Sequence, residues 1–166
     1  MNEILGDRWT VIAIGGVAAL MVAFAGGVLT VVGPWYEGLR FPSWRPPNWL
    51  FGPAWTLIFI CIASSGIIAW DAAETDSQRN WLLVLFAING VFNIAWSGLF
   101  FRMQRPDWAL GDLVLLWLSI LVLVIATARI SATAGWLMSP YLAWVSFAGV
   151  LNFKIVQLNW PFKADA

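Results

Sequence analysis

Charged residues occur at only a few places along the chain and leave five long uncharged segments between them. These segments cover residues 9–36, 46–70, 80–101, 113–128 and 130–153. A helix needs about 20 residues to cross a hydrocarbon core of about 30 Å, and the segment that begins at 113 reaches this length if the helix starts at Trp108. The pattern predicts five membrane-spanning helices over residues 9–32, 49–70, 81–101, 108–128 and 136–158.

The composition supports the same interpretation. The chain has 166 residues, of which 61% are hydrophobic and 11% are charged. A soluble domain carries about 25% charged residues, which excludes a soluble helical bundle. The first segment is interpreted as a true span and not as a signal peptide, because its flank MNEILGDR has no net positive charge and its apolar run continues to Val32. We expect one all-α integral membrane domain over residues 1–166, built as a five-transmembrane-helix bundle.

The distribution of basic residues predicts the orientation of the bundle. The N-terminus and the loops 71–80 and 129–135 carry Arg8, Arg79 and Arg129. The opposite side carries Arg40, Arg45, Arg102, Arg105, Lys154 and Lys163. Because basic residues accumulate on the cytoplasmic side, we expect the N-terminus outside and the C-terminus in the cytoplasm.

Several kinds of chemistry are excluded by the residue types present. The chain has no histidine, and its single cysteine, Cys61, falls inside the second predicted span. A disulfide within the chain, a structural zinc site and a His-based triad are therefore excluded, and we expect neither a metal site nor catalytic residues. The net charge of zero provides no argument for a nucleic-acid partner.

The thirteen tryptophans divide into two groups. Seven fall at predicted span ends, as in an aromatic belt: Trp9, Trp49, Trp70, Trp81, Trp108, Trp136 and Trp160. The other six lie deeper or in the first loop: Trp35, Trp44, Trp55, Trp96, Trp117 and Trp144. An indole N–H inside the membrane needs a partner, so the second group is the more informative one.

The first span carries a stripe of small residues at every fourth position, namely Gly15, Ala19, Ala23 and Gly27. Such a stripe lets another helix approach closely. The neighbour is a helix of the same chain, which we favour, or a helix of a second copy.

Polar residues share one face of the third span. Asn89, Asn93 and Ser97 recur every four residues, with Trp96 beside them. They either form interhelical hydrogen bonds or line a polar notch that orients a ligand. The fifth span has a related face, formed by Trp144, Ala148, Leu151 and Asn152. A Trp above an Ala leaves a shelf for a flat ligand, although the small residue also suits a neighbouring helix.

Asp112 is the only acidic residue well inside a predicted span. A carboxylate in a membrane is a functional candidate. We favour the simpler interpretation, an ion pair with Arg105 or Arg102 of the preceding loop or snorkelling to the interface.

The segment 35–55, WYEGLRFPSWRPPNWLFGPAW, lies between the first two spans. Its prolines prevent a regular helix, and its aromatic residues are costly to leave in water. The loop either anchors the bundle in the interface or folds back as an aromatic lid, with Arg40 and Arg45 over the bundle mouth.

Three segments resemble the TspO/MBR family of tryptophan-rich sensory proteins and translocator proteins. They are WYEGLRFPSWRPPNWLFGPAWT at 35–56, NIAWSGLFF at 93–101 and PYLAWVSFAGVLNFKIVQLN at 140–159. The resemblance implies a five-helix membrane bundle that forms dimers, in this case in a bacterial cell envelope. It also implies a pocket for flat hydrophobic ligands, among them porphyrin, haem and, in mitochondrial members, sterols.

Carried over to this chain, the implied pocket takes residues from the lid and three spans. They are Trp35, Tyr36, Trp44, Pro47, Trp55, Asn93, Trp96, Ser97, Trp144, Ala148 and Leu151. Arg40 and Arg45 join them as candidates for an anionic edge of the ligand. Phe41 stands where the family usually has Lys, Phe59 where Tyr is common, and Phe153 where the sterol pattern needs Tyr.

The missing histidine bears on haem, whose iron is usually held by His, Cys, Met or Tyr. We expect a porphyrin to be recognised through its ring and its carboxylates, with no required cofactor. A membrane receptor for tetrapyrroles is the leading function. The alternatives are an enzyme that promotes light-dependent porphyrin degradation and a transporter of sterols, lipids or small molecules.

Overall fold

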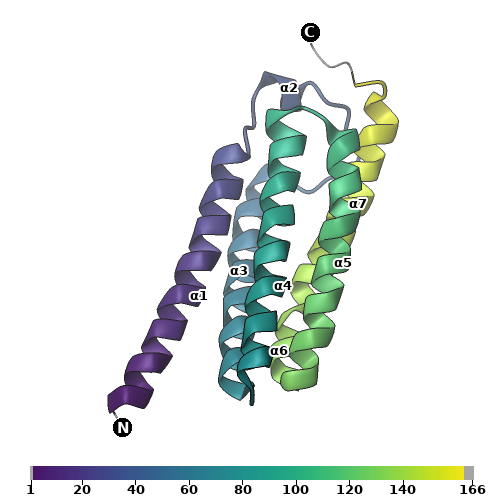
Figure 1. Ribbon diagram of the computed structural model, residues 1–166. Helices are drawn as coiled ribbons and strands as arrows, with labels where there is room; N and C mark the ends of the chain where they lie inside the picture. The colour runs from purple at the N-terminus through teal and green to yellow at the C-terminus, as the bar shows by residue number, and fades with distance from the viewer. Residues whose placement is uncertain (1, 163–166) are drawn as a thin grey trace.

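The computed structural model describes the backbone of residues 2–162 and the side chains of residues 9, 10 and 12–162. Its helices are α1 (Asn2–Leu29), α2 (Pro34–Glu37), α3 (Asn48–Ala72), α4 (Asp76–Ser97), the π-helical turn η1 (Gly98–Arg102), α5 (Pro106–Ile130), α6 (Ala132–Leu137) and α7 (Ser139–Asn159). In the described chain, five helical segments are long and apolar enough to cross a membrane: Ile12–Leu29, Asn48–Ala72, Asp76–Arg102, Pro106–Ile130 and Ala132–Asn159. They form a bundle with the start of α1 and the end of α7 at opposite poles (Figure 1), so the predicted fold class is confirmed.

The polar segment 71–80, expected to be a loop, is partly helical. Helix α4 begins at Asp76 because Thr75 and Gln78 form a reciprocal cap. The Thr75 hydroxyl accepts a hydrogen bond from the Gln78 backbone N–H at 3.2 Å, and Oε1 of Gln78 accepts one from the Thr75 N–H at 3.2 Å. These bonds satisfy N–H groups that a helix start leaves unpaired, so the helix extends beyond the apolar run.

The segment 129–135, also expected to be a loop, is almost entirely helical. Helix α5 continues to Ile130, and Ser131 separates it from α6. A Cβ atom at Gly135 would lie 2.5 Å from Cβ of Ala128 and 2.8 Å from its Cα. The chain therefore reverses direction here by a backbone approach that only glycine permits.

Helix α1 lies at the side of the bundle, against α3 and α4 (Figure 1). A Cβ at Gly15 would touch Ile67 of α3, whereas a Cβ at Gly27 would meet nothing within 4 Å. Ala19 and Ala23 are half-buried and Gly27 is exposed. The intrachain interpretation of the small-residue stripe is therefore confirmed at Gly15, while Gly27 faces outward.

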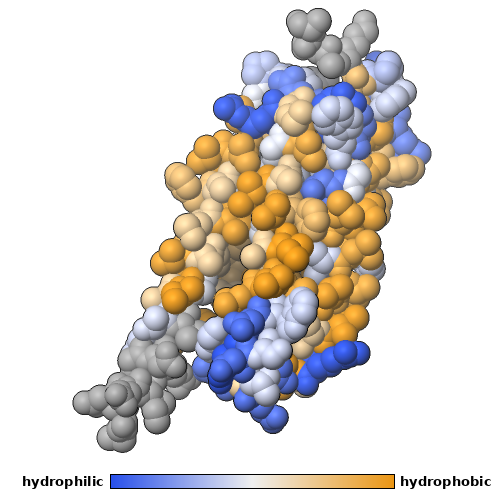
Figure 2. Space-filling model, in the orientation of Figure 1, coloured by the Kyte–Doolittle hydropathy of each residue, from blue (hydrophilic) through white to orange (hydrophobic). Residues whose placement is uncertain are grey.

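The face of the molecule shown in Figure 2 is hydrophobic over the middle of the bundle and hydrophilic at both poles. Six tryptophans of the expected belt are at least half exposed: Trp9, Trp49, Trp81, Trp108, Trp136 and Trp160. The seventh, Trp70, is half-buried, with the Arg79 guanidinium 5.9 Å from its ring centroid. This surface is the one expected of a protein with its midsection in lipid.

Candidate ligand-binding site

The loop between α1 and α3 covers one pole of the bundle as a lid. Its short helix α2 lies over the end of α4 (Figure 1). Tyr36 is 9% exposed, and its ring centroid lies 5.6 Å from that of Phe101 and 6.5 Å from that of Phe100. Two successive residues reach the same ring from the π-helical turn η1, which is wider than a regular helical turn. Trp35 adds an edge contact to Phe100 at 6.1 Å.

Arg45 is held inside the lid by aromatic rings. Its guanidinium carbon lies 3.8 Å from the ring centroid of Phe41 and 5.3 Å from that of Tyr36, and it donates a hydrogen bond to Oδ1 of Asn48. Phe41, which stands where the family pattern has a cation, therefore supports a neighbouring cation. Burial raises the pKa of the Tyr36 hydroxyl, and the charge of Arg45 opposes this shift.

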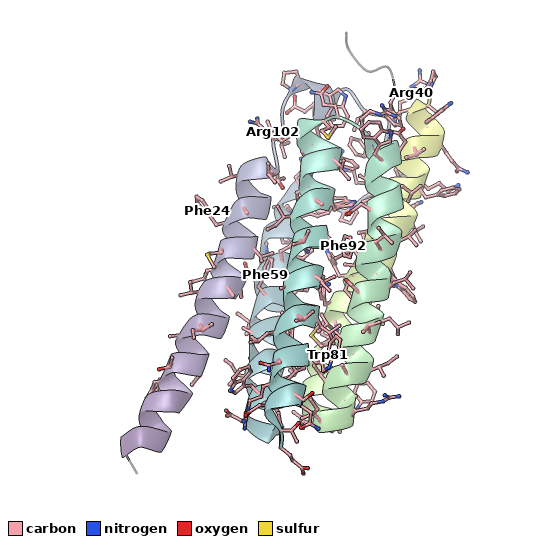
Figure 3. The ribbon with its side chains drawn as sticks, in the orientation of Figure 1. Phe24, Arg40, Phe59, Trp81, Phe92 and Arg102 are labelled. Atoms are coloured by element: carbon pink, nitrogen blue, oxygen red, sulfur yellow. The ribbon has the colours of Figure 1, made fainter. Side chains whose placement is uncertain are left out.

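Asn159, at the end of α7, fastens the lid to the bundle. Its Oδ1 accepts a hydrogen bond from the Arg40 backbone N–H at 2.8 Å, and its Nδ2 donates one to the Arg40 carbonyl at 2.9 Å. Nδ2 also donates to the Ile155 carbonyl at 2.8 Å. The Arg40 side chain is exposed at the lid pole (Figure 3). Sequence reasoning did not single out Asn159, because its partner is backbone.

From Arg40 the lid descends along α7 to Trp44. The ring centroids of Trp44 and Phe147 are 5.9 Å apart, and Phe147 lies about 18 Å below Asn159 along the helix. Phe147 contacts Trp144 at 5.8 Å, and Trp144 contacts Phe51 of α3 at 5.6 Å. A continuous row of aromatic rings thus leads from the lid toward the middle of the bundle.

Below this row lies a groove between α3 and α7 with a volume of about 300 Å³. Its lining residues are Ala54, Leu57, Ile58, Pro140, Ala143, Trp144 and Phe147. Leu57 is 59% exposed, and Ala143 and Pro140 are also exposed, so the groove opens on the outer face. Of the residues expected to bind a ligand, Trp144 lines the groove directly. Trp44 does not line it but contacts Phe147, which is the lining residue nearest the lid. The lateral position was not foreseen, because the sequence does not show that α3 and α7 are neighbours.

The polar residues of α4 form a buried network inside the bundle. Nδ2 of Asn93 donates to the Tyr141 hydroxyl at 3.0 Å, which donates to Oδ1 of Asn89 at 3.3 Å. Nδ2 of Asn89 donates to Oγ of Ser119 at 2.8 Å. The network joins α4, α5 and α7, as the interhelical interpretation predicted. Its centre, Tyr141, is 0% exposed and was not predicted. The sequence signal that could have identified it is a tyrosine hydroxyl inside an otherwise apolar span.

Trp96 connects the lid to the core. Its ring stacks on Phe100 at a centroid distance of 5.2 Å and meets the edge of Phe101 at 6.0 Å. Its Nε1 is buried and has no hydrogen-bond partner among the described residues. Ser97 points toward α1, since a Cβ at Gly26 would lie 3.6 Å from its Oγ.

The remaining candidates surround the same core. Trp55 meets the edge of Tyr141 at 6.1 Å, and Ala148 and Trp144 both pack against the core cluster that contains Tyr141. Leu151 is 7% exposed and belongs to the cluster of Tyr36, whereas Pro47 is exposed at the start of α3. The Asn152 amide faces α5, where it can donate to the Pro106 carbonyl at 3.3 Å and accept from the Leu110 N–H at 3.1 Å.

The expected ion pair of Asp112 is wrong. Arg105 pairs with Asp107, its Nε donating to Oδ1 at 2.8 Å. Asp107 lies in the first turn of α5, two residues after Arg105, so pairing these two residues closes a shorter loop than pairing Arg105 with Asp112. Asp112 is half-buried, and its Oδ2 has no hydrogen-bond partner among the described residues.

These features define a five-helix integral membrane protein with an aromatic lid and a lateral aromatic groove. The chain belongs to the TspO/MBR family, whose sequence model matches residues 12–158. It is 44% identical to the tryptophan-rich protein TspO of Chlorobaculum tepidum over 142 residues, which cover 84% of this chain and 90% of that protein.

Two further relatives come from different branches of life. Protein CrtK of Rhodobacter capsulatus is 34% identical over 141 residues, covering 85% of this chain and 88% of that protein. The translocator protein of Homo sapiens is 32% identical over 130 residues, covering 78% and 77%. The family expected from the motifs is thereby confirmed.

Proposed function

We propose that the protein is a membrane receptor that binds tetrapyrroles, porphyrin and haem among them, as flat hydrophobic ligands. The observation that carries the proposal is the apolar groove between α3 and α7, walled by Trp144 and Phe147 and joined to the lid through Trp44. Aromatic walls favour a flat conjugated ring by offset stacking, and burial of its apolar surface provides the main driving force.

The anionic edge of such a ligand has partners at the lid. Arg45 follows Trp44 in the chain, and Arg40 projects from the same loop. The two cations differ in their freedom: Arg45 is held by rings and Asn48, whereas no ion pair among the described residues engages the Arg40 guanidinium. Carboxylates pair well with guanidinium groups, so propionates directed toward the lid complete the recognition.

The iron of haem contributes little to this binding. The chain has no histidine, and Cys61 does not line the groove. Haem and metal-free protoporphyrin should therefore bind within about threefold of each other, since ring and carboxylates are the same in both. Tenfold tighter binding of haem that is lost in Cys61→Ala would show that iron ligation matters.

The test is quenching of tryptophan fluorescence by metal-free protoporphyrin, with the protein in lipid nanodiscs. We expect quenching that saturates at one porphyrin per chain, above the linear background of empty nanodiscs mixed with free tryptophan. Quenching that grows linearly with porphyrin and never saturates would mean that the ligand only partitions into lipid.

A second function, light-dependent degradation of the bound porphyrin, is favoured by one observation. Trp44 and Trp144 both contact Phe147, so oxidisable indoles flank the groove. Illumination of the complex in air, with molecular oxygen as the oxidant, should then consume porphyrin, with the rate reduced in Trp44→Phe or Trp144→Phe at equal occupancy. Equal degradation rates in the unmodified protein and the two variants would argue against this second function and would not affect the proposed receptor function.

The remaining assignments concern location and partners. We infer that the membrane is that of a bacterial cell envelope. The basic residues at the lid pole support a C-terminus in the cytoplasm. Of the residues counted for this orientation, Lys163 and the side chain of Arg8 lie outside the described part of the chain. The exposed apolar face of α1, with Gly27 on it, supports a homodimer. Transport ranks lower, because the residues that line the groove carry no charge. Sterol binding is not supported either, because Phe153 stands where the sterol pattern needs Tyr.

A further inference from the structure

We propose that the ligand enters the groove between α3 and α7 sideways, directly from the bilayer, and not from water past the lid. The inference rests on the proposed function, since it concerns the route to the same site. It commits to one occupant, a flat apolar ring with one anionic edge that is already dissolved in the membrane.

The lid is closed by several independent contacts. The Arg40 backbone is bonded in both directions by Asn159, and the Arg45 guanidinium lies on Phe41 and is bonded to Asn48. Tyr36 is buried against η1. A route from water would have to separate all of these contacts for each binding event.

The groove, in contrast, is open at the depth of the hydrocarbon. It lies at the level of Phe147, about 18 Å from the lid end of α7, where a molecule in the membrane core can approach it. Leu57 and Ala143 form an exposed rim, and the small side chains of Ala54 and Ala143 leave the space between the two helices. All of the residues that line the groove are apolar, so an apolar molecule meets no polar side chain there.

The orientation of the occupant follows from the charges. The groove is lined by apolar side chains, and its upper residue, Phe147, contacts Trp44 of the lid. The lid carries Arg45 directly after Trp44 in the chain, and Arg40 higher up, at the Asn159 end of α7. A ring that slides in from the bilayer thus places its apolar part between Ala54 and Ala143 and turns its carboxylates toward the lid.

The experiment compares a locked lid with a plugged groove. In a Cys61→Ser background, Leu39→Cys and Asn159→Cys are joined by a short bismaleimide, which ties the lid to α7; the same double variant without the linker has a loosened lid. Protoporphyrin is supplied from donor vesicles, and its association with the protein in nanodiscs is followed by tryptophan quenching. We expect the linked and unlinked proteins to associate at rates within twofold of each other.

The plug variants are Ala54→Phe and Ala143→Phe, with the milder Ala143→Leu as a second variant should either bulky change prevent folding. We expect the association rate to fall at least tenfold for the Phe variants. Ile60→Phe, which adds the same ring at a position on α3 that is 59% exposed and outside the groove, should change it by less than twofold.

Two results would overturn the route. A tenfold slower association after linking, with recovery in the unlinked protein, would show that the ligand passes through the lid. Unchanged rates in all plug variants would exclude the groove. Failure of the proposed function itself would give a different result: if the protein does not bind porphyrin at a specific site, quenching would not saturate even in the unmodified protein.

Discussion

Asn159 and Arg40 are 119 positions apart in the chain, and the side-chain amide of the first is bonded to both backbone groups of the second. The amide replaces the partners that a strand or a helix would offer to Arg40, so an irregular loop is held in one place at the end of α7. Because the bonds involve backbone, they hold the lid whatever side chain stands at position 40.

Replacing Asn159 by leucine should release this part of the lid. Three hydrogen bonds are lost, two to the Arg40 backbone and one to the Ile155 carbonyl, each contributing about 0.5–1.5 kcal/mol to stability. We expect the Arg40 amide to exchange its hydrogen at least tenfold faster, as measured by hydrogen–deuterium exchange. Gln157→Ala, which removes an exposed partner of Lys154 on the same helix, is the control and should leave Arg40 unchanged. Continued protection of Arg40 in Asn159→Leu would contradict the assignment.

Tyr141→Phe should destabilise the bundle although it keeps the ring. The hydroxyl is the acceptor for Asn93 and the donor to Asn89, so its removal leaves two buried amides incompletely bonded, at a cost of about 1–3 kcal/mol. The free energy of unfolding in mixed micelles gives the measurement. Ser139→Ala, which removes a hydroxyl bonded only to the Trp136 carbonyl, should cost much less. Equal costs for the two variants would count against a central role for Tyr141.

Gly135→Ala should be one of the most destabilising alanine substitutions in the chain. The new Cβ would lie 2.5 Å from that of Ala128, so α6 must move away from α5. We expect a lower thermal midpoint, with partial recovery in the double variant Gly135→Ala with Ala128→Gly. Recovery stays partial because the Ala128 Cα lies only 2.8 Å away.

Gly27→Ala is the matched control, because its Cβ would meet nothing within 4 Å. Ala in a helix interior is favoured over Gly by about 0.5–1 kcal/mol, so this variant should be neutral or slightly stabilising. A clear loss of stability at position 27 would instead indicate that Gly27 lies in a close contact between two copies of the chain.

Asp112→Asn should leave stability unchanged or raise it. The carboxylate has one buried oxygen without a hydrogen-bond partner among the described residues, and its expected partner Arg105 is engaged by Asp107. A neutral amide of the same shape avoids the cost of a charge at this depth. Thermal unfolding of Asp107→Asn provides the comparison and should show a loss, because it breaks an existing ion pair.

The parts of the structure that were predictable follow from periodicity and polarity. Five apolar segments need five helices to satisfy their backbone in lipid, and seven tryptophans at their ends indicated the belt. The lid was predictable because Trp35, Tyr36 and Phe41 cannot remain in water between two spans.

The parts that were not predictable depend on which helices are neighbours. The groove requires α3 and α7 to bring Ala54 and Ala143 into one lining, and the buried network requires Tyr141 to bond both Asn89 and Asn93. Neither pairing is visible in a single sequence, because every helix offers several apolar faces. The helical boundaries near Thr75 and Ser131 shifted for a local reason, since capping bonds extend helices into polar segments.

The central claim is that a tetrapyrrole binds in the groove against Trp144, and a pair of tryptophan variants tests it most directly. Trp144→Ala removes the aromatic wall, whereas Trp136→Ala removes a belt residue that is 77% exposed and lies outside the groove. Titration with protoporphyrin should show at least tenfold weaker binding in Trp144→Ala and an affinity within twofold of the unmodified protein in Trp136→Ala. Equal affinities in the two variants would contradict the account.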